Sequence, residues 1–324
     1  MIVLITGSNG FIGRHLVLAC LSKGFHVFGL DIHSRPAIKH PALLFSYLQC
    51  DILNAALFEE ILISTSPGII FNLAANVDVF SSSPVSYSVN YLPLFSIFKY
   101  LKNSQATLVQ CSSMLVCQYG NVTDSTDFSD RPSTLYGYSK LIAEQLILLH
   151  ISQGIANIRI ARLTTVWGEG MYGPIVKLFA PSRLLLTSSS FKGKKTFCYV
   201  KNCCEDLISL ALYQGSLPSV SLIGDPEYMS SYEFISIIHS QVKSTLPQPS
   251  TLLDIPYPIL KFCAILLDIF PSMYRYFHFN SFHLSNLVDS NIAAPLFASF
   301  NPSPRIPPSQ AVRETIQIYS HTCN

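Results

Sequence analysis

The sequence predicts an α/β protein built on a doubly wound parallel sheet, followed by a smaller second α/β domain. Two observations favour this fold class. Short apolar runs alternate with longer amphipathic segments through the first half of the chain, which is the order typical of βαβ units. The first apolar run, Ile2 to Thr6, also leads directly into a loop with three glycines spaced by three, at Gly7, Gly10 and Gly13.

The predicted elements follow the chain in the order that such a sheet needs. Strands are predicted at Ile2 to Thr6, His26 to Asp31, Phe45 to Cys50, Ile69 to Leu73, Thr107 to Cys111 and Ile158 to Arg162. Helices are predicted, from the apolar spacing, at Phe11 to Ser22, Ala55 to Ile63, Val85 to Leu101 and Thr134 to Ser152. After about residue 165 the alternation is lost, and prolines and serines become frequent. We therefore expect a first domain over residues 1–168 and a second over residues 169–324.

The composition limits the kind of partner. The 324 residues include 21 Lys and Arg against 19 Asp and Glu, a formal charge of +2, so the chain lacks the basic excess that favours nucleic acid. A small-molecule substrate is the expected partner, and a homodimer stays open. Nine cysteines are scattered without a preceding secretory signal, which favours reduced thiols in the cytoplasm. None has the spacing of zinc ligands, and we expect no metal.

The best candidate for a membrane span is the apolar segment from Ile259 to Phe270, in a chain that is 49% hydrophobic and 12% charged. Pro258 and Pro271 bound this segment, and it carries Lys261 and Asp268. About 20 apolar residues are needed to cross a bilayer, so the segment is too short. We expect no transmembrane span, and a helix that is buried or lies against a membrane surface.

The glycine loop predicts a dinucleotide site of the Rossmann type. A pyrophosphate binds against backbone N–H groups at a helix N-terminus, and a Cβ at either of the first two glycines would hold it away. Glycines alone often only make turns, but these lie between a strand and a helix at the start of a βαβ unit. The first domain is therefore expected to bind a dinucleotide, and the second to bind mainly the substrate. The expected cofactor contacts are Gly7, Asn9, Gly10, Phe11, Ile12 and Gly13.

An acidic residue at the end of the second strand bears on the choice of cofactor. Asp31 lies 24 residues after Gly7, where its carboxylate can accept hydrogen bonds from the adenosine ribose. This favours NAD over NADP, whose 2′-phosphate it would repel, although Arg35 could attract that phosphate instead. A turn at the strand end is the alternative role for Asp31. Asp51 and Ile52 follow the third strand and are expected near adenine, with capping of the next helix as the alternative for Asp51.

A tyrosine and a lysine spaced by four carry the expected chemistry. Tyr136 and Lys140 share one face of a helix. Hydride transfer at a carbinol carbon requires proton transfer at its oxygen, and a neighbouring ammonium lowers the pKa of tyrosine from its ordinary value of about 10. Tyr257 and Lys261 have the same spacing, but a proline follows this tyrosine and no serine-bearing strand precedes it. We interpret the second pair as surface residues.

Ser113 is the residue that distinguishes the pair of Tyr136 and Lys140 from the pair of Tyr257 and Lys261. It follows an apolar strand and lies 23 residues before Tyr136, which places its hydroxyl at the carboxyl edge of the sheet, where open α/β proteins bind ligands. There it can hydrogen-bond the same substrate oxygen as Tyr136. A serine that only ends a strand is the alternative.

These residues resemble the extended short-chain dehydrogenase/reductase family, within it most the branch of 3β-hydroxysteroid dehydrogenases and dihydroflavonol reductases. The marks of this resemblance, which covers most of the chain, are Thr6 to Gly13, Asn72 to Ala75, Asn90, Ser112 and Ser113, Tyr136 to Lys140 with Glu144, and Arg162 followed by Val166 to Gly168. The resemblance implies an NAD- or NADP-dependent oxidoreductase whose catalytic residues are Ser113, Tyr136 and Lys140. It implies that the cofactor also contacts Tyr136, Lys140, Leu73, Ala74, Ala75 and Asn90, with Lys140 on the nicotinamide ribose.

The second half of the chain also resembles this family. Tyr199 to Asn202 are similar to a strand that returns to the nucleotide domain, so a return is expected near residues 196–215. Two departures bear on the substrate. Cys117 stands where many relatives have tyrosine, which disfavours a nucleotide-sugar epimerase or dehydratase. The acidic pair common in the family near residue 202 is missing, and Asn202 stands in its place.

Three functions are compatible with these features. The first is hydride transfer between NAD(P) and a secondary alcohol or ketone of an apolar, sterol-like or polyketide-like substrate. Its pocket would be lined by apolar residues of the second half, namely Phe262, Ile265, Leu266, Phe270, Tyr274, Tyr276 and Phe277. The second is epimerisation or dehydration of a nucleotide-linked sugar, whose diphosphate would meet Lys192, Lys194 and Lys195. The third is a non-catalytic dinucleotide sensor, which the retained tyrosine and lysine disfavour.

Overall fold

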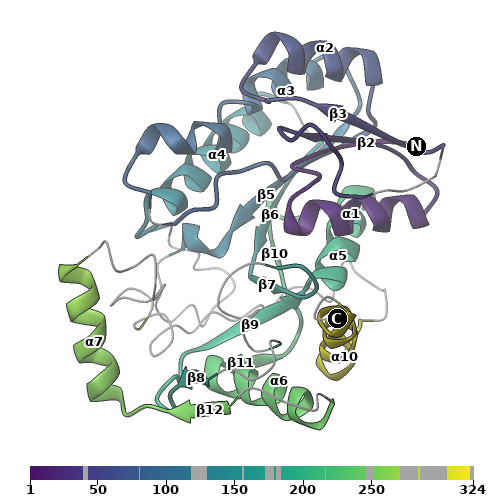
Figure 1. Ribbon diagram of the computed structural model, residues 1–324. Helices are drawn as coiled ribbons and strands as arrows, with labels where there is room; N and C mark the ends of the chain where they lie inside the picture. Colours follow the sequence, from purple (N-terminus) through teal and green to yellow (C-terminus); the bar gives the residue numbers. More distant parts are fainter. Residues whose placement is uncertain are drawn as a thin grey trace.

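The computed structural model of the chain is an α/β protein with a large parallel sheet covered by helices on both faces (Figure 1). It describes residues 1–38, 43–79, 81–117, 130–154, 157–171, 179, 184–215, 217–245, 251–270, 284 and 305–321.

The central sheet has seven parallel strands in the order β10-β6-β5-β4-β1-β2-β3. These strands are β1 (Ile2–Thr6), β2 (His26–Asp31), β3 (Phe45–Gln49), β4 (Ile69–Asn72), β5 (Thr107–Ser113), β6 (Ile158–Leu163) and β10 (Val220–Ile223). Their centre is rich in buried Val, Ile and Leu because both faces of a parallel sheet are covered. The chain runs outward to β3, then returns beside β1 with β4, so the strand order reverses between β1 and β4. The predicted doubly wound sheet is confirmed.

Helices cover the two faces of the sheet in two groups (Figure 1). One face packs against α1 (Phe11–Ser22) and α5 (Val200–Leu212), and the other against α2 (Ala55–Thr65), α3 (Leu94–Leu101) and α4 (Leu135–Ser152). The single helix predicted over Val85 to Leu101 is wrong. The structure has a 3-10 helix, η1 (Pro84–Asn90), and then α3, because Pro93 supplies no N–H for a continuous helix and is the N-cap of α3.

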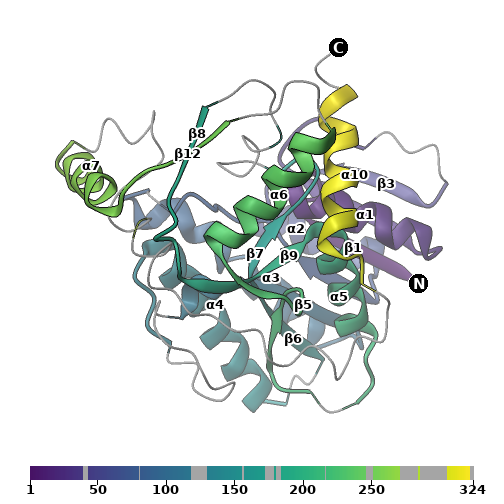
Figure 2. The same ribbon diagram turned by 90° about the horizontal axis from the view of Figure 1, so that it is seen from below.

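The second half of the chain forms a smaller α/β layer next to the carboxyl end of the sheet. Strands β7 (Thr165–Trp167), β9 (Lys194–Tyr199) and β11 (Tyr228–Ser230) make a three-stranded sheet, and β8 (Leu184–Thr187) pairs with β12 (Thr251–Asp254). Figure 2 shows α6 (Ser231–Thr245) alongside α10 (Pro308–His321), and these two helices are in contact. Helix α5 lies against α1, and β10 joins the central sheet. The division of the chain near residue 168 stays a prediction.

The segment expected to be a short apolar helix forms α7 (Tyr257–Ile269). Two of its residues, Leu260 and Ala264, are buried, in a small cluster with Phe191 and Leu284. Within the ranges given above, the structure has no helix that combines the length and the apolar character needed to cross a lipid bilayer.

A half-buried arginine attaches the last helix to the rest of the fold. Arg305 donates to Asp206 on α5 at 2.8 Å and to Asp225 at 3.1 Å. Asn202 on α5 exchanges two hydrogen bonds with the backbone of Ile306, each 3.0 Å long. Asn202 therefore fastens the segment that leads into α10.

Candidate active site

The glycine loop forms an open cradle between β1 and α1. Gly7 has a φ of 69°, and a Cβ there would lie 2.9 Å from the Cα of Ala74. A Cβ on Gly13 would lie 2.0 Å from the carbonyl oxygen of Gly7, so a side chain fits at neither position. No side chain caps the N-terminus of α1, and its first turn carries no acidic residue. The free N–H groups of this turn and the absent side chains fit a pyrophosphate.

Phe11 and Ile12 begin α1 and pack their side chains against the hydrophobic core. They therefore offer backbone N–H groups to a ligand at the cradle.

A buried threonine fixes the turn that faces the glycine loop. The hydroxyl of Thr6 donates to Asn72 at 2.7 Å and accepts the N–H groups of Leu73 and Ala74, both at 3.1 Å. These bonds hold Leu73 to Ala75 beside Gly7, at the carboxyl edge where the strand order reverses. Open α/β sheets bind ligands at such a reversal. Thr6 was not among the predicted site residues, although a polar side chain that ends an apolar strand was the available signal.

Asp31 lies next to the glycine loop at the end of β2. One carboxylate oxygen accepts the backbone N–H of Asn9 at 3.0 Å, and the other is 2.6 Å from Nδ1 of His33. The side chain of Asp31 is 9% exposed. This placement suits a residue that accepts ribose hydroxyl groups.

Asp51 does not cap α2. The cap is Asn54, whose side chain accepts the N–H of Leu57 at 3.3 Å, whereas Asp51 accepts the N–H of Leu53 in the preceding turn. The alternative role of Asp51 as a helix cap is therefore wrong, because the turn adds three residues before the helix begins. Ile52 is buried.

Ser113, Tyr136 and Lys140 come together at the carboxyl end of β5. A side-chain hydrogen bond joins Ser113 to Tyr136. The ammonium of Lys140 lies 5.9 Å from the centre of the Tyr136 ring and donates to the carbonyl oxygen of Cys111 at 2.9 Å. Thr134 caps α4 by accepting the N–H of Gly137 at 3.0 Å, which places Tyr136 in the first turn. The chain thus brings the three predicted catalytic residues into one cluster.

Burial controls the electrostatics of this cluster. Burial raises the pKa of Tyr136 to about 12, although the hydrogen bond with Ser113 acts in the opposite direction and lowers it. Burial lowers the pKa of Lys140 to about 8, because a buried ammonium loses its hydration. We expected the ammonium of Lys140 to lower the pKa of Tyr136, but in this structure burial raises that pKa, and the lowering comes from the hydrogen bond with Ser113.

Gly137 allows α4 to approach the strand end closely. A Cβ at this position would lie 2.3 Å from the carbonyl oxygen of Leu115, in the turn that follows Ser113. The helix with Tyr136 and the turn with Ser113 therefore touch through their backbones. The predicted site residues did not include Gly137, although a glycine inside a helical pattern was the signal for a close approach.

Asn90 contacts α4 at Ser139, the residue before Lys140. Its side-chain amide donates to Oγ of Ser139 at 2.8 Å and to the carbonyl of Asn76 at 3.1 Å, and its oxygen accepts the N–H of Asn76 at 2.8 Å. Its hydrogen bonds to Ser139 and Asn76 make Asn90 a positioning residue for α4. Its predicted contact with a cofactor stays a prediction.

A buried ion pair lies behind the catalytic cluster. The guanidinium of Arg162 on β6 donates to Glu144 on α4 at 2.9 Å and to Asp130 at 2.6 Å. Ser112, the neighbour of Ser113, donates its hydroxyl to the same Glu144. Glu144 and Arg162 are both nearly inaccessible to solvent. Together these bonds connect β5, α4 and β6 directly behind the site.

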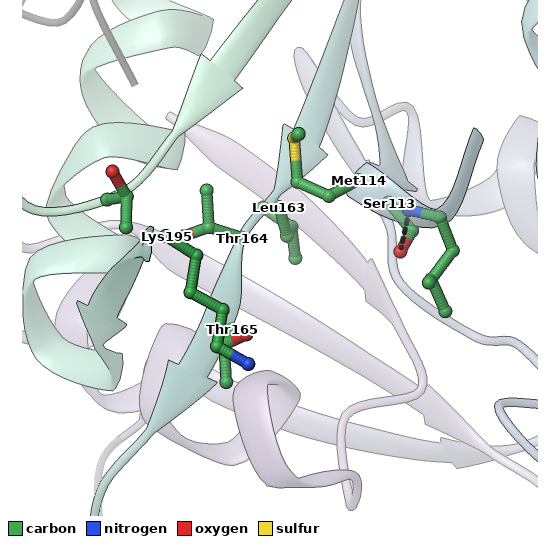
Figure 3. Close-up of a pocket in the computed structure, with 8 residues that line it drawn as sticks. Ser113, Met114, Leu163, Thr164, Thr165 and Lys195 are labelled. Carbon is green, nitrogen blue, oxygen red and sulfur yellow. Dashed lines mark hydrogen bonds between the residues drawn. The ribbon is translucent and has the colours of Figure 1, made fainter. Parts of the chain in front are cut away.

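A cavity of about 170 Å³ adjoins Ser113 (Figure 3). Figure 3 shows Ser113 and Met114 across this space from Thr164 and Lys195. Burial lowers the pKa of Lys195 to about 8. Within the described part of the chain, the hydroxyl groups of Thr164 and Thr196 have no hydrogen-bond partner. The complete lining is Ser113, Met114, Leu115, Leu163, Thr164, Thr165, Lys195 and Thr196.

The order of these features along the chain agrees with a known family. Residues 3–205, which hold the glycine loop, Asp31 and the catalytic cluster, match the family described as "NAD dependent epimerase/dehydratase family". The chain belongs to this family.

Curated relatives in the NAD dependent epimerase/dehydratase family differ in their reactions. The chain is 24% identical over 260 residues to UDP-glucuronic acid decarboxylase 1 of Danio rerio, across 75% of this chain and 61% of that protein. It is 26% identical over 260 residues to 3-beta-hydroxysteroid dehydrogenase of Mycolicibacterium neoaurum, across 72% of this chain and 68% of that protein. The match therefore spans less than two thirds of the length of the first relative.

Solved structures share the fold of this chain. The UDP-glucuronic acid 4-epimerase from Bacillus cereus, in complex with UDP-glucuronic acid and NAD, superposes with a TM-score of 0.74 at 19% identity. The superposition covers 99% of this chain and 100% of that one. At this identity the likeness concerns the fold, and the NAD cofactor follows from the family and from the fit of the glycine loop.

Proposed function

We propose that the protein is an NAD-dependent oxidoreductase that transfers a hydride between the nicotinamide ring and a secondary alcohol or ketone. The observation that most supports this function is the cluster of Ser113, Tyr136 and Lys140, at the carboxyl edge of the same sheet as the glycine loop.

Each part of the cofactor has residues suited to hold it. The glycine loop would hold the pyrophosphate, Asp31 the adenosine ribose and Lys140 the nicotinamide ribose. Bound NAD supplies the hydride acceptor, and the protein supplies position and electrostatics.

The two hydroxyl groups of the cluster would act on the substrate oxygen. Ser113 fixes the direction of that oxygen, and Tyr136 accepts its proton when an alcohol is oxidised. Burial by itself disfavours the phenolate that this step needs. The hydrogen bond with Ser113 offsets part of this cost. The ammonium of Lys140 lies 5.9 Å from the centre of the Tyr136 ring, where its positive charge would favour a phenolate.

The structure does not support an apolar pocket formed by α7. Phe262 is 64% exposed and Phe270 is 54% exposed, and neither lines the cavity beside Ser113. Ile265 and Leu266 are also exposed. The packed side of this helix is formed by Leu260 and Ala264. The other aromatic residues named for this pocket, Tyr274, Tyr276 and Phe277, lie outside the described residues.

A second candidate function follows from the cavity itself. Lys195 lines this cavity together with Ser113, whereas Lys192 and Lys194 are exposed. A buried ammonium beside unpaired hydroxyl groups favours a ligand with a negative charge. We propose as the alternative that the substrate is a nucleotide-linked sugar, oxidised and reduced again within one turnover.

Net production of NADH separates the two candidates. The purified protein would be incubated with NAD and either a hydroxysteroid or UDP-glucuronic acid, and both NADH and sugar products would be measured. Accumulating NADH supports the alcohol oxidoreductase. Conversion of the sugar nucleotide without accumulating NADH supports the alternative, and Lys195→Met should then reduce that conversion. A protein that binds NADH and converts neither class of substrate would contradict both proposals.

A further inference from the structure

The loop after β2 is attached to the glycine loop by one side chain. The amide nitrogen of Asn9 donates to the carbonyl of Arg35 at 2.9 Å and to the hydroxyl of Tyr47 at 3.0 Å. The amide oxygen of Asn9 accepts the N–H of Ala37 at 2.7 Å. Since the backbone N–H of Asn9 also bonds Asp31, the loop over residues 31–37 and the cofactor cradle form one unit.

Within this unit a histidine pairs with the residue that selects the cofactor. Nδ1 of His33 is 2.6 Å from one carboxylate oxygen of Asp31, and its backbone N–H approaches the same oxygen at 3.3 Å. The hydroxyl of Tyr47 donates to the carbonyl of His33 at 2.5 Å, which fixes the backbone under the ring. The side chain of His33 is 71% exposed, so its ring can exchange protons with solvent.

The charges around Asp31 change with the state of this ring. Among the described residues, the titratable groups at this loop are Asp31 on β2, His33 and Arg35 on the loop, and Tyr47 on β3. Burial raises the pKa of Tyr47, so its phenol stays neutral around neutral pH. With a neutral His33, the charges of Asp31 and Arg35 cancel. With a protonated His33, the loop carries a net charge of +1.

We propose that His33 makes the choice between NAD and NADP depend on pH. An imidazole is the side chain that ordinarily changes charge between about pH 5 and 8. Its neutral form leaves the Asp31 carboxylate to repel a 2′-phosphate and to accept ribose hydroxyl groups, which selects NAD. Its protonated form offsets that carboxylate and, together with Arg35, attracts the phosphate. The protein then accepts NADP more readily as the pH falls.

Affinity measurements test this proposal without any substrate. The dissociation constants of NADH and NADPH would be measured by calorimetry at about pH 6 and about pH 8, and their ratio compared between the wild type and His33→Gln. The glutamine keeps a hydrogen-bond donor and cannot be protonated. When the pH is lowered from 8 to 6, the ratio of the NADPH dissociation constant to the NADH dissociation constant should fall about threefold to tenfold more in the wild type than in His33→Gln. This is the scale expected for one unit charge at a few ångströms from a partly solvated phosphate.

Two further variants complete the test. His33→Arg carries a permanent charge, so it should prefer NADPH more than His33→Gln does at both pH values and should show the same reduced pH response as His33→Gln. His26→Gln changes the histidine at the start of β2, at the opposite end of the strand from Asp31, and should keep the wild-type response. The 2′-phosphate itself has an ionisation near about pH 6, but it contributes equally in every protein compared.

The outcomes separate this proposal from the cofactor assignment. If the protein binds NADH and the dependence of the NADPH-to-NADH ratio on pH is the same in His33→Gln as in the wild type, the role of His33 is overturned and the cofactor assignment stands. A wild-type protein that binds neither dinucleotide would overturn both.

Discussion

The ammonium of Lys140 lies 5.9 Å from the centre of the Tyr136 ring and is hydrogen-bonded to the carbonyl of Cys111. The strand that carries Ser113 thus also holds the lysine that faces the tyrosine. Because β5 orients two of the three catalytic groups, the spacing of the cluster depends on how α4 packs on this strand.

Removing the Tyr136 hydroxyl should separate chemistry from cofactor binding. Tyr136→Phe takes away the proton acceptor and leaves the glycine loop intact, so turnover should fall at least about a hundredfold while NADH affinity changes only a few fold. Calorimetry and steady-state kinetics measure the two effects. Tyr138→Phe, on the same helix but 52% exposed, and Tyr257→Phe should be nearly silent. Parent-level turnover in Tyr136→Phe would place the active site elsewhere.

The pKa of Lys140 predicts an alkaline limit for activity that stability does not share. Because burial lowers this pKa to about 8, the ammonium is lost above that pH and turnover should decline there. The unfolded chain keeps its lysine protonated up to about pH 10.4, so between these values the unfolded state binds more protons. This group therefore makes the folded state more stable as the pH rises. A parallel loss of activity and of stability, measured by denaturant titration above pH 8, would contradict this explanation.

Lys140→Met should lose turnover and also weaken NADH binding, because the same ammonium is expected to reach the nicotinamide ribose. The control is Lys261→Met at the second tyrosine–lysine pair, which should bind NADH and turn over like the parent. Unchanged NADH affinity in Lys140→Met would limit this lysine to the proton-transfer step.

Two glycines of the cofactor loop should fail in different ways. A Cβ on Gly10 lies 3.1 Å from the carbonyl of Gly7, so Gly10→Val should fold and lose NADH binding because its side chain fills the cradle. Gly13→Ala places a Cβ 2.0 Å from the same oxygen and should destabilise the protein by roughly 1–3 kcal/mol, the usual scale of overpacking. Thermal unfolding and calorimetry distinguish the two defects. Full NADH affinity in folded Gly10→Val would show that the loop does not hold the pyrophosphate.

The buried ion pair behind the site should matter far more than an exposed one. Glu144→Gln leaves the Arg162 charge with a weakened set of partners inside the protein and should cost about 3 kcal/mol in the free energy of unfolding. Lys99→Ala breaks a pair with Glu59 whose lysine is 70% exposed, and should leave the free energy of unfolding almost unchanged. Equal losses in urea titrations would mean that burial does not set the strength of these pairs.

Much of the fold could be predicted because its signals are local. The strands around Ile5 and Ile70 are continuous apolar runs, and the glycine loop and the tyrosine–lysine spacing each occupy a few consecutive residues. The break at Pro93 was also visible in the sequence, but the apolar pattern on both sides of it was given more weight.

Contacts between distant segments could not be predicted in the same way. Lys195 reaches the cavity of Ser113 because β9 pairs with β7 directly after β6, and no local pattern records that pairing. In the opposite direction, Phe262 has the character of a pocket residue, yet its exposure depends on which side of α7 packs. Asn9 belongs to the glycine motif, but the loop that its side chain holds is 26 residues further along the chain.

The close approach at Gly137 means that the distance between the hydroxyl groups of Ser113 and Tyr136 depends on the absence of a side chain at residue 137. A methyl group at this position would act as a wedge between helix and strand, moving Tyr136 away from Ser113 while leaving both residues chemically unchanged. No substitution of the serine or the tyrosine could restore the lost alignment. The spacing of the cluster is therefore adjustable at a residue other than Ser113 and Tyr136 themselves.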